Sequence, residues 1–407
     1  MTQPFTLGVN YWPRRKAMYW WSNFDRGEVR EEFAIIREYG MTLVRIFLLW
    51  DDWQPEPERV SSACLDNLTA VCEAATDNDL QLDVTFFTGH MSGPNWAPRW
   101  LLSGSPSQVP SPHVRQVISG GKVVQSGYRN PLVDPIALQA ERMLLKTVVG
   151  ELKSHPAIGM WNLGNEPDLF AWPPSADRGR AWVGEMTDLI RSIDEARPVT
   201  CGLHMSSLVE NNGFRVDQVF RATDVAVMHA YPMYAPQARH PLDPDVAPFT
   251  CALVCALCGK SALMEEFGGC TTPDGGPSQT WEWTASGRPR RQFMASEDDF
   301  AQYVAAVLPK LIEVGSTGAL LWCFADYDRS LWQRPPCDEA RHERHFGLLR
   351  PDGSIKPHAA IVRDFAAGQP VVHEAVKRIS LPMSPDEFYR DPLTHTSQLY
   401  REFSGEA

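Results

Sequence analysis

The sequence predicts an α/β fold, a (β/α)8 TIM barrel, in which eight parallel strands alternate with helices and close into a ring. Apolar segments of strand length alternate with amphipathic helical segments along most of the chain, which is the pattern of parallel βα units. No G-x-G-x-x-G motif follows any of these strand segments. The main sign of a doubly wound, dinucleotide-binding sheet is therefore missing, and the barrel is the better prediction.

The predicted strands are short apolar runs, and the predicted helices carry apolar residues at intervals of three and four. The third helix illustrates how the boundaries are set, because Asp134 is a good N-cap and Pro135 suits the first helical position. The predicted strands span residues 5–10, 43–49, 80–87, 158–163, 198–203, 224–232, 261–267 and 318–324. The predicted helices span residues 28–39, 62–77, 134–153, 178–196, 248–259, 297–314 and 356–367.

The chain has 407 residues, enough for one large barrel. We assign residues 1–370 to a catalytic barrel and residues 371–407, rich in Pro, Asp and Arg, to a short C-terminal extension. The extension is either packed or loosely held, and the sequence leaves both open. The βα loops after the first, third, seventh and eighth strands are long, and loops at that end of a barrel form its active site. Long loops on one mouth predict an enclosed pocket.

Composition narrows the class of ligand. The net charge is −12, with 43% hydrophobic and 22% charged residues, which disfavours nucleic-acid and anionic-membrane partners and suits a neutral ligand. The sequence contains no run of 18 apolar residues, the length at which a membrane span would be predicted. The first residues lack the pattern of a secretory signal. Nine scattered cysteines fit reduced thiols, so we expect a cytoplasmic protein. A homo-oligomer remains possible.

Two glutamates stand where the predicted fourth and seventh strands end. Glu166 follows the apolar run IGMWNLGN, and Glu266 lies in SALMEEFGG. A carboxylate at the end of a barrel strand suits a cleft better than a core. Breaking a glycosidic bond needs one carboxylic acid to protonate the leaving oxygen and one carboxylate to attack or to activate water. We therefore predict that Glu166 and Glu266 converge on one substrate bond.

The motifs N-E-P at Glu166 and E-F-G at Glu266, with Trp322 ending the eighth strand, resemble those of clan A retaining glycoside hydrolases, most closely glycoside hydrolase family 5. That family includes cellulases, mannanases and β-mannosidases. The resemblance covers about residues 5–367. It implies that Glu166 is the general acid/base and that Glu266 is the nucleophile. Strand alternation predicts that Glu265 faces the opposite side from Glu266.

The resemblance also implies roles for residues around the two acids. Asn165 matches the residue that binds the sugar 2-hydroxyl, and Arg45 matches an arginine that fixes the nucleophile. The family's His-x-Tyr pair matches His229 and Tyr231, with the tyrosine hydroxyl on the nucleophile. Trp322 matches the platform under the sugar, and His90 resembles a substrate-side histidine. From their own positions, Arg45 also suits a structural ion pair, and His229, Tyr231 and Trp322 also suit core packing.

Further substrate contacts are predicted from the tryptophans of the long loops, because indole faces stack on sugars. Trp12 and Trp96 are the two that we assign to substrate binding. The other tryptophans of these loops are Trp20, Trp21, Trp100, Trp281, Trp283 and Trp332. Such residues also pack cores and rims, and that alternative stays open for each of them.

One cysteine pattern and one histidine pattern have spacings found in metal sites, but their sequence context favours other interpretations. Cys251, Cys255 and Cys258 have the C-x3-C-x2-C spacing of the iron–sulfur cluster in radical-SAM barrels. In those barrels the triad follows the first strand, whereas here it lies on a predicted helix among apolar residues, as buried thiols do. His342 and His345, in RHERH, are expected on a solvated surface. We predict no metal and no cofactor.

The function expected from the resemblance is a retaining β-glycoside hydrolase that works by double displacement through a glycosyl-enzyme intermediate. We expect exo action on short β-linked oligosaccharides, as in β-mannosidases, because the mouth loops are long and no secretion signal is seen. The alternatives are a β-glucosidase, an endo-β-mannanase or cellulase, a transglycosylase and a non-catalytic sugar-binding barrel. For the mechanism, we expect Glu266 to be ionised and Glu166 to have a raised pKa.

Overall fold

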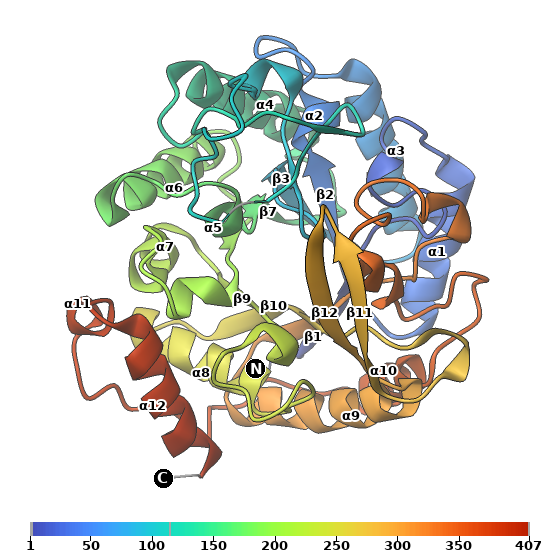
Figure 1. Cartoon of the computed structure of the whole chain (residues 1–407), viewed down its shortest axis with the longest axis vertical. Helices are drawn as coiled ribbons and strands as arrows, with labels where there is room; N and C mark the ends of the chain where they lie inside the picture. The colour runs from blue at the N-terminus through green and yellow to red at the C-terminus, as the bar shows by residue number, and fades with distance from the viewer. Residues whose placement is uncertain (1–2, 114, 406–407) are drawn as a thin grey trace.

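The computed structural model describes residues 3–113 and 115–405 and contains a ring of eight parallel strands (Figure 1). Hydrogen bonds link the strands in the order β8-β7-β3-β2-β1-β13-β10-β9. The two end strands meet through a parallel bridge between His204 and His229, and the His229 N–H donates to the Leu203 carbonyl at 3.0 Å. The ring is therefore closed, and the predicted (β/α)8 barrel is confirmed.

The barrel strands lie close to their predicted positions. Their side chains are almost all buried, as expected for parallel strands covered by helices on the outside and packed side chains within. The strands are β1 (Thr6–Asn10), β2 (Leu43–Leu49), β3 (Gln81–Thr88), β7 (Ile158–Asn165), β8 (Val199–Gly202), β9 (Ala226–Ala230), β10 (Ala262–Gly268) and β13 (Gly318–Trp322).

One principal helix follows each barrel strand and packs on the outside of the ring (Figure 1). Several begin at side-chain caps that satisfy free backbone N–H groups, such as Asp134, whose carboxylate accepts from Ile136 and Ala137. The helices are α1 (Arg26–Glu38), α3 (Ser62–Asp77), α4 (Pro135–Leu152), α6 (Ala176–Arg191), α7 (Val216–Ala222), α8 (Val246–Cys258), α9 (Glu297–Glu313) and α10 (Pro357–Ala367).

The elements that the sequence analysis missed lie mainly in the long loops. Helix α7 fills the stretch between the fifth and sixth barrel strands. Strands β11 (Gln279–Ala285) and β12 (Arg288–Met294) form an antiparallel hairpin that lies over the open face of the barrel (Figure 1). The loop after β3 contains a small sheet of β4 (Asn95–Trp96), β5 (Val117–Ser119) and β6 (Lys122–Val124). Short helices α2 (Trp50–Trp53) and α5 (Pro167–Phe170) follow β2 and β7.

The C-terminal extension ends in helices α11 (Pro385–Phe388) and α12 (Pro392–Ser404), which lie outside the barrel beside α8 (Figure 1). Tyr400 and Phe403 pack edge-on against Phe249 of α8, with ring centroids 5.0 and 5.5 Å away. The described part of the extension is therefore packed on the barrel. The division of the chain at residue 370 stays a prediction.

Helix α8 also carries the cysteine triad. Cys251 is buried and Cys255 and Cys258 are half-buried, all three with free thiols. Cys251 Sγ lies 3.9 Å from the Ser316 hydroxyl, so it packs against the barrel wall as a small apolar residue. Separately, none of the helices in the described ranges is long and apolar enough to span a bilayer.

Candidate active site

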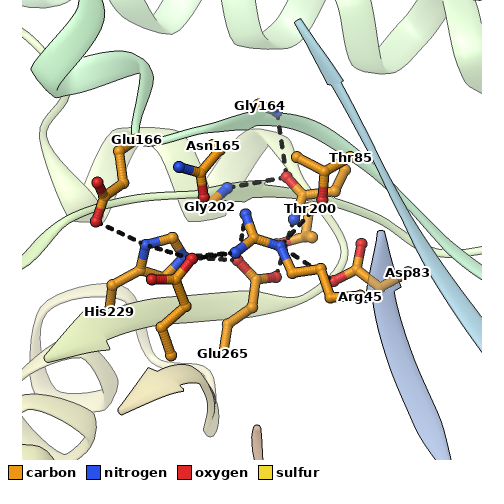
Figure 2. Close-up of polar contacts among 12 residues, drawn as sticks. Arg45, Asp83, Thr85, Gly164, Asn165, Glu166, Thr200, Gly202, His229 and Glu265 are labelled. Atoms are coloured by element: carbon orange, nitrogen blue, oxygen red, sulfur yellow. Dashed lines mark hydrogen bonds and ion pairs between the residues drawn. The ribbon is translucent and has the colours of Figure 1, made fainter. Parts of the chain in front are cut away.

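Chemically active side chains gather at the carboxyl ends of the barrel strands (Figure 2). Because parallel strands present these ends to the same mouth, residues far apart in the sequence become neighbours there. We call this group the floor of the site. It consists of Arg45 on β2, Asn165 and Glu166 at the end of β7, His229 on β9, Tyr231 just after it, Glu265 and Glu266 on β10, and Trp322 at the end of β13.

The two predicted acids converge. A carboxylate oxygen of Glu166, one of Glu266 and a ring nitrogen of His229 all lie within 4.8 Å of one another. Glu166 occupies the left-handed region, with φ of 48°, where the chain turns from β7 into α5. Non-glycine residues in this region are often held there at functional sites. The Glu166 N–H donates to the Gly202 carbonyl at 2.9 Å, which fixes this turn.

Glu266 is held by the two residues that the resemblance implies. Arg45 Nη1 donates to Glu266 Oε1 at 2.5 Å, and the Tyr231 hydroxyl donates to Oε2 at 2.6 Å. Arg45 is fully buried and also donates to Thr85 and Asn10. Both oxygens of Glu266 are thus oriented by donors, an arrangement suited to a carboxylate that must present one oxygen to a reacting carbon.

Glu265 does not face away from Glu266, and the prediction from strand alternation is wrong. The register of β10 against β9 shifts between Met264 and Glu266, so Glu265 is the extra residue of a bulge. Its carboxylate points to the barrel axis, 2.9 Å from His229 Nε2, and accepts from Asn162 Nδ2 at 3.0 Å. Glu266 borders the open cavity whereas Glu265 is fully buried beneath it, so position still favours Glu266 as the nucleophile.

His229 lies between the acids and carries charge. Its Nδ1 is 3.0 Å from Glu166 Oε1 and its Nε2 is 2.9 Å from Glu265 Oε2 (Figure 2). Burial lowers the pKa of His229, but Glu266, Glu166 and Glu265 outweigh burial and raise it to about 10. The imidazole is therefore protonated at neutral pH, and both of its nitrogens donate to carboxylates.

This charge reverses the pKa order that we expected for the two acids. Burial raises the pKa of Glu166, but the neighbouring histidines outweigh burial and hold the pKa below its usual range. The pKa values of His204 and His90 fall to about 4 and about 3 on burial, so only His229 is charged at neutral pH. Burial raises the pKa of Glu266 against the pull of His229 and Arg45. In the free site the proton therefore lies on His229.

The remaining predicted substrate residues divide into two groups. Asn165, His90 and Trp322 line the cavity above the acids. Asn165 Nδ2 donates to the His90 carbonyl at 2.9 Å, and His90 Nε2 lies 3.7 Å from Glu166 Oε2. These residues, together with Tyr231, are therefore placed to contact a bound sugar.

Trp12 and Trp96 are not brought to the cavity, and we correct their assignment. Trp12 is fully buried and stacks on Phe47 with ring centroids 5.1 Å apart. Trp96 is 1% exposed, and its indole N–H donates to the Met91 carbonyl at 3.3 Å. The loop tryptophans pack the loops together, and among the loop tryptophans named above it is Trp283 that borders the cavity.

The cavity has a volume of about 570 Å³ and is covered by the loops after the third, seventh and eighth barrel strands, which are three of the four long loops that were predicted to enclose a pocket. We call three segments the roof: residues 90–113 and 115–116 after β3, the hairpin 279–294 after β10, and residues 336–346 after β13. Their position after barrel strands was the available signal, but their side chains could not be placed without the fold. Cavity-lining residues that the sequence analysis missed include Arg115, Gln116, His204, Tyr234, Trp283, Arg290, Glu339, His342 and Glu343.

The RHERH segment belongs to this roof, and its predicted place on a solvated surface is wrong. His342 and Glu343 line the cavity, and His345 is 1% exposed. Burial lowers the pKa of His342 to about 4. The polar sequence resembled a surface segment because contacts that bury it, such as those of His342 with Tyr234 and of His345 with Trp281, come from loops distant in the sequence.

One carboxylate ties the three parts of the roof together. Glu339 Oε1 accepts from the Ser286 N–H at 2.9 Å, and Oε2 accepts from Gln116 Nε2 at 2.5 Å. The Glu339 carbonyl accepts from the Trp283 indole N–H at 2.6 Å. We call this set of contacts the roof clasp. It fixes the tip of the hairpin over the cavity.

A cation could be held in the floor only by displacing a proton. Glu166, His229 and Glu266 are close enough to share an ion, but a histidine ligand must be neutral. Here His229 is protonated by its carboxylate neighbours. The same three groups suit proton transfer and nucleophilic attack, chemistry for which no metal is required.

The comparisons with known proteins agree with this fold. Residues 113–240, which contain Glu166, match the family model described as glycosyl hydrolases family 2, TIM barrel domain. The structure of GH5_18 from Streptomyces cattleya in complex with GlcNAc superposes with a TM-score of 0.80 at 18% identity, covering 100% of this chain and 92% of that one. An alanine variant of the same enzyme, in complex with Manβ1-4GlcNAc, gives 0.77 at 18% identity, covering 98% of this chain and 90% of that one.

A further similar structure is the exo-β-1,4-mannosidase Op5Man5 from Opitutaceae bacterium strain TAV5, with a TM-score of 0.72 and 21% identity over 90% of this chain. The chain spans 60% of the length of that protein. At these identities the structural likeness establishes the fold, and the family model covers part of the barrel. The predicted barrel is thereby confirmed: the chain has a TIM-barrel fold similar to the folds of these glycoside hydrolases.

Proposed function

We propose that this protein is a retaining β-glycosidase that removes single sugars from short β-linked oligosaccharides. The observation that carries the proposal is the approach of Glu166 and Glu266 to within 4.8 Å at the base of one cavity. Retaining glycosidases hold their carboxyl groups about 5–5.5 Å apart, whereas inverting enzymes leave about 6.5–9.5 Å for a water molecule. The separation in this chain supports the retaining geometry.

In this mechanism Glu266 attacks the anomeric carbon and the bond to the leaving oxygen breaks. Arg45 and Tyr231 orient the attacking carboxylate. Glu166 delivers a proton to the leaving oxygen. Because His229 Nδ1 lies 3.0 Å from Glu166, transfer of its proton gives Glu166 the acid form that this step needs. Glu166 then accepts a proton from a water molecule as that water attacks the anomeric carbon. The attack breaks the ester bond to Glu266 and releases the sugar with its original configuration.

The proposed substrate is a β-mannoside of two or three sugars. Support comes from two similar structures, one named an exo-β-1,4-mannosidase and one holding Manβ1-4GlcNAc. The clasped roof also supports exo action, because a cavity of about 570 Å³ is of the size that holds a small ligand. The proposed cytoplasmic location rests on the sequence and fits substrates that are already short.

The proposal is tested by turnover of aryl β-mannosides, aryl β-glucosides and β-1,4-linked mannooligosaccharides. We expect the β-mannoside to be preferred, mannose to be the first product, and NMR spectroscopy to show the β-anomer before mutarotation. Mass spectrometry after reaction with a 2-deoxy-2-fluoro-β-mannoside is expected to show the sugar on Glu266. An α-anomer as first product would exclude retention, and fragments of mixed length would exclude exo action.

A further inference from the structure

Besides Glu339, whose carboxylate is bound in the roof clasp, a second carboxyl group of the roof reaches the cavity. Glu343 lies in the short helix η7 (Arg341–His345), and its side chain lines the same cavity as the two catalytic acids. The side chain is 11% exposed, compared with 10% for Glu166 and 4% for Glu266. Glu343 is therefore as open to the cavity as the proposed acid/base.

Neighbours on both sides hold η7 in this orientation. Arg344 points away from the cavity, donates to the carbonyls of Cys337 and Trp332 at 2.8 and 3.1 Å, and lies over the Trp332 ring. His345 packs between Trp281 and Trp332, with ring centroids 5.6 and 5.5 Å away. With these two side chains anchored behind the helix, Glu343 is directed into the cavity.

Nothing in the described part of the protein neutralises Glu343. Its contacts are His342 Nε2 at 3.4 Å and the nearby Ser92 hydroxyl, and no lysine or arginine within the described ranges forms an ion pair with it. His342 is itself uncharged at neutral pH, because burial lowers its pKa to about 4. A buried carboxyl without a cation and with unused hydrogen-bonding capacity is costly. A packing role does not account for it.

Burial, opposed by Ser92 and reinforced by Glu166 and Glu266, raises the pKa of Glu343 to about 8. At neutral pH the group is therefore largely a carboxylic acid, with one O–H donor and free acceptor positions. Sugar hydroxyls offer the complementary donors and acceptors. A ligand that supplied these donors and acceptors would remove the free-energy cost of leaving the Glu343 carboxyl group without hydrogen-bond partners.

We propose that Glu343 is a specificity-determining residue that hydrogen-bonds hydroxyl groups of the sugar bound above Glu166 and Glu266. The inference rests on the proposed glycosidase activity. A site built around a buried polar group rejects a ligand that lacks the matching hydroxyl, since the group is then left unpaired. Glu343 thus selects among sugars by the position of their hydroxyl groups, separately from the two acids that break the bond.

The test uses aryl β-mannosides that each lack one hydroxyl group. With the full-length wild-type enzyme, we expect removal of one particular hydroxyl to lower kcat/KM by about tenfold or more. We call the fold decrease in kcat/KM on removal of a hydroxyl group the deoxy penalty. In Glu343→Ala the deoxy penalty at that position is expected to fall close to one, while the deoxy penalties at other positions persist. In Glu343→Gln, which keeps the shape and one donor and acceptor, the penalty is expected to be intermediate. Asp338→Asn is the matched control, because Asp338 is an acid of the same segment that does not line the cavity.

The outcomes separate this inference from the proposed function. If the wild-type enzyme turns over no β-glycoside, the proposed function fails. If it turns over β-mannosides but every deoxy penalty is the same in wild type and Glu343→Ala, Glu343 does not read a hydroxyl. The wild-type series is decisive even where the variants fold poorly, because the absence of any position with a penalty of about threefold or more would also overturn the inference.

Discussion

In the floor of the site, side chains project from the ends of barrel strands, whereas in the roof they project from long loops. Strand geometry fixes the floor: Arg45 reaches Glu266 because β2 and β10 end at the same mouth. The roof depends on contacts between loops, such as Glu339 with Ser286 and Gln116. We therefore expect the floor to determine the chemistry and the roof to determine which sugars reach it.

The largest effect is expected from Glu266→Ala. Removal of the nucleophile should lower kcat for aryl β-mannosides by roughly 10⁴-fold or more, because an essential covalent step is lost. Circular dichroism and thermal unfolding check that the fold is retained. Glu265→Ala is the matched comparison in the same double-glutamate motif. If the 2-deoxy-2-fluoro-β-mannoside labelled Glu265 and Glu266→Ala kept its activity, Glu265 would be the nucleophile instead.

Glu265→Gln is expected to have a smaller effect, through His229. Losing a carboxylate 2.9 Å from Nε2 lowers the pKa of His229, which its neighbours raise to about 10. The imidazole then loses its proton at lower pH, so the alkaline limb of the kcat/KM profile should move down by about one unit or more. Activity at neutral pH should fall by about a hundredfold at most. An unmoved limb would show that proton supply does not pass through His229.

The roof clasp offers a third test. Glu339→Ala removes the acceptors of Ser286 and Gln116, which frees the hairpin tip. We expect kcat for an aryl β-mannoside to change little and KM for a mannooligosaccharide to rise about tenfold. Glu282→Ala is the control, since Glu282 is an exposed residue of the same hairpin. Equal losses for the aryl and the oligosaccharide substrates would assign the clasp a purely structural role.

The same contrast explains what the sequence could predict. Eight apolar segments and two strand-end acids suffice to predict the barrel and the approach of Glu166 to Glu266. Closure of the parallel ring brings the carboxyl ends of all its strands to the same mouth. Glu265 was misplaced because a bulge is set by pairing with β9 and leaves no mark in a single strand. Trp12 and Trp96 were misassigned because composition does not tell which indole faces are covered.

The errors in the roof have a different origin. All five residues of RHERH are charged or titratable, which is the pattern of a solvated loop when the neighbours are unknown. Its burial comes from the hairpin, through Trp281, and from the stretch just before it, through Trp332 and Cys337. The pKa order of the two acids was missed for a related reason, since it depends on the proton that three carboxylates hold on His229.

The smallest effect, on stability, probes the roof alone. The pKa of Glu343 is raised from 4.5 to about 8 in the folded protein, so folding favours the protonated form. Its contribution to stability is complete below the ordinary carboxyl pKa and is lost as the pH rises through about 8. Gln cannot ionise. The melting temperature of Glu343→Gln relative to wild type should therefore rise between pH 5 and pH 8 and level off above, by a few degrees in total.

Scanning calorimetry at several pH values measures this difference, with Asp338→Asn as the control from the same segment. A difference that stays constant with pH would mean that Glu343 ionises in the folded protein as it does in the unfolded chain, which requires a cation or open solvent beside it. Because Glu166 and Glu266 lie in the same cavity and oppose a further negative charge, a bound neutral sugar should steepen the dependence. The bound sugar excludes water from the Glu343 carboxyl group. The group must then either stay protonated or lose its contact with the sugar.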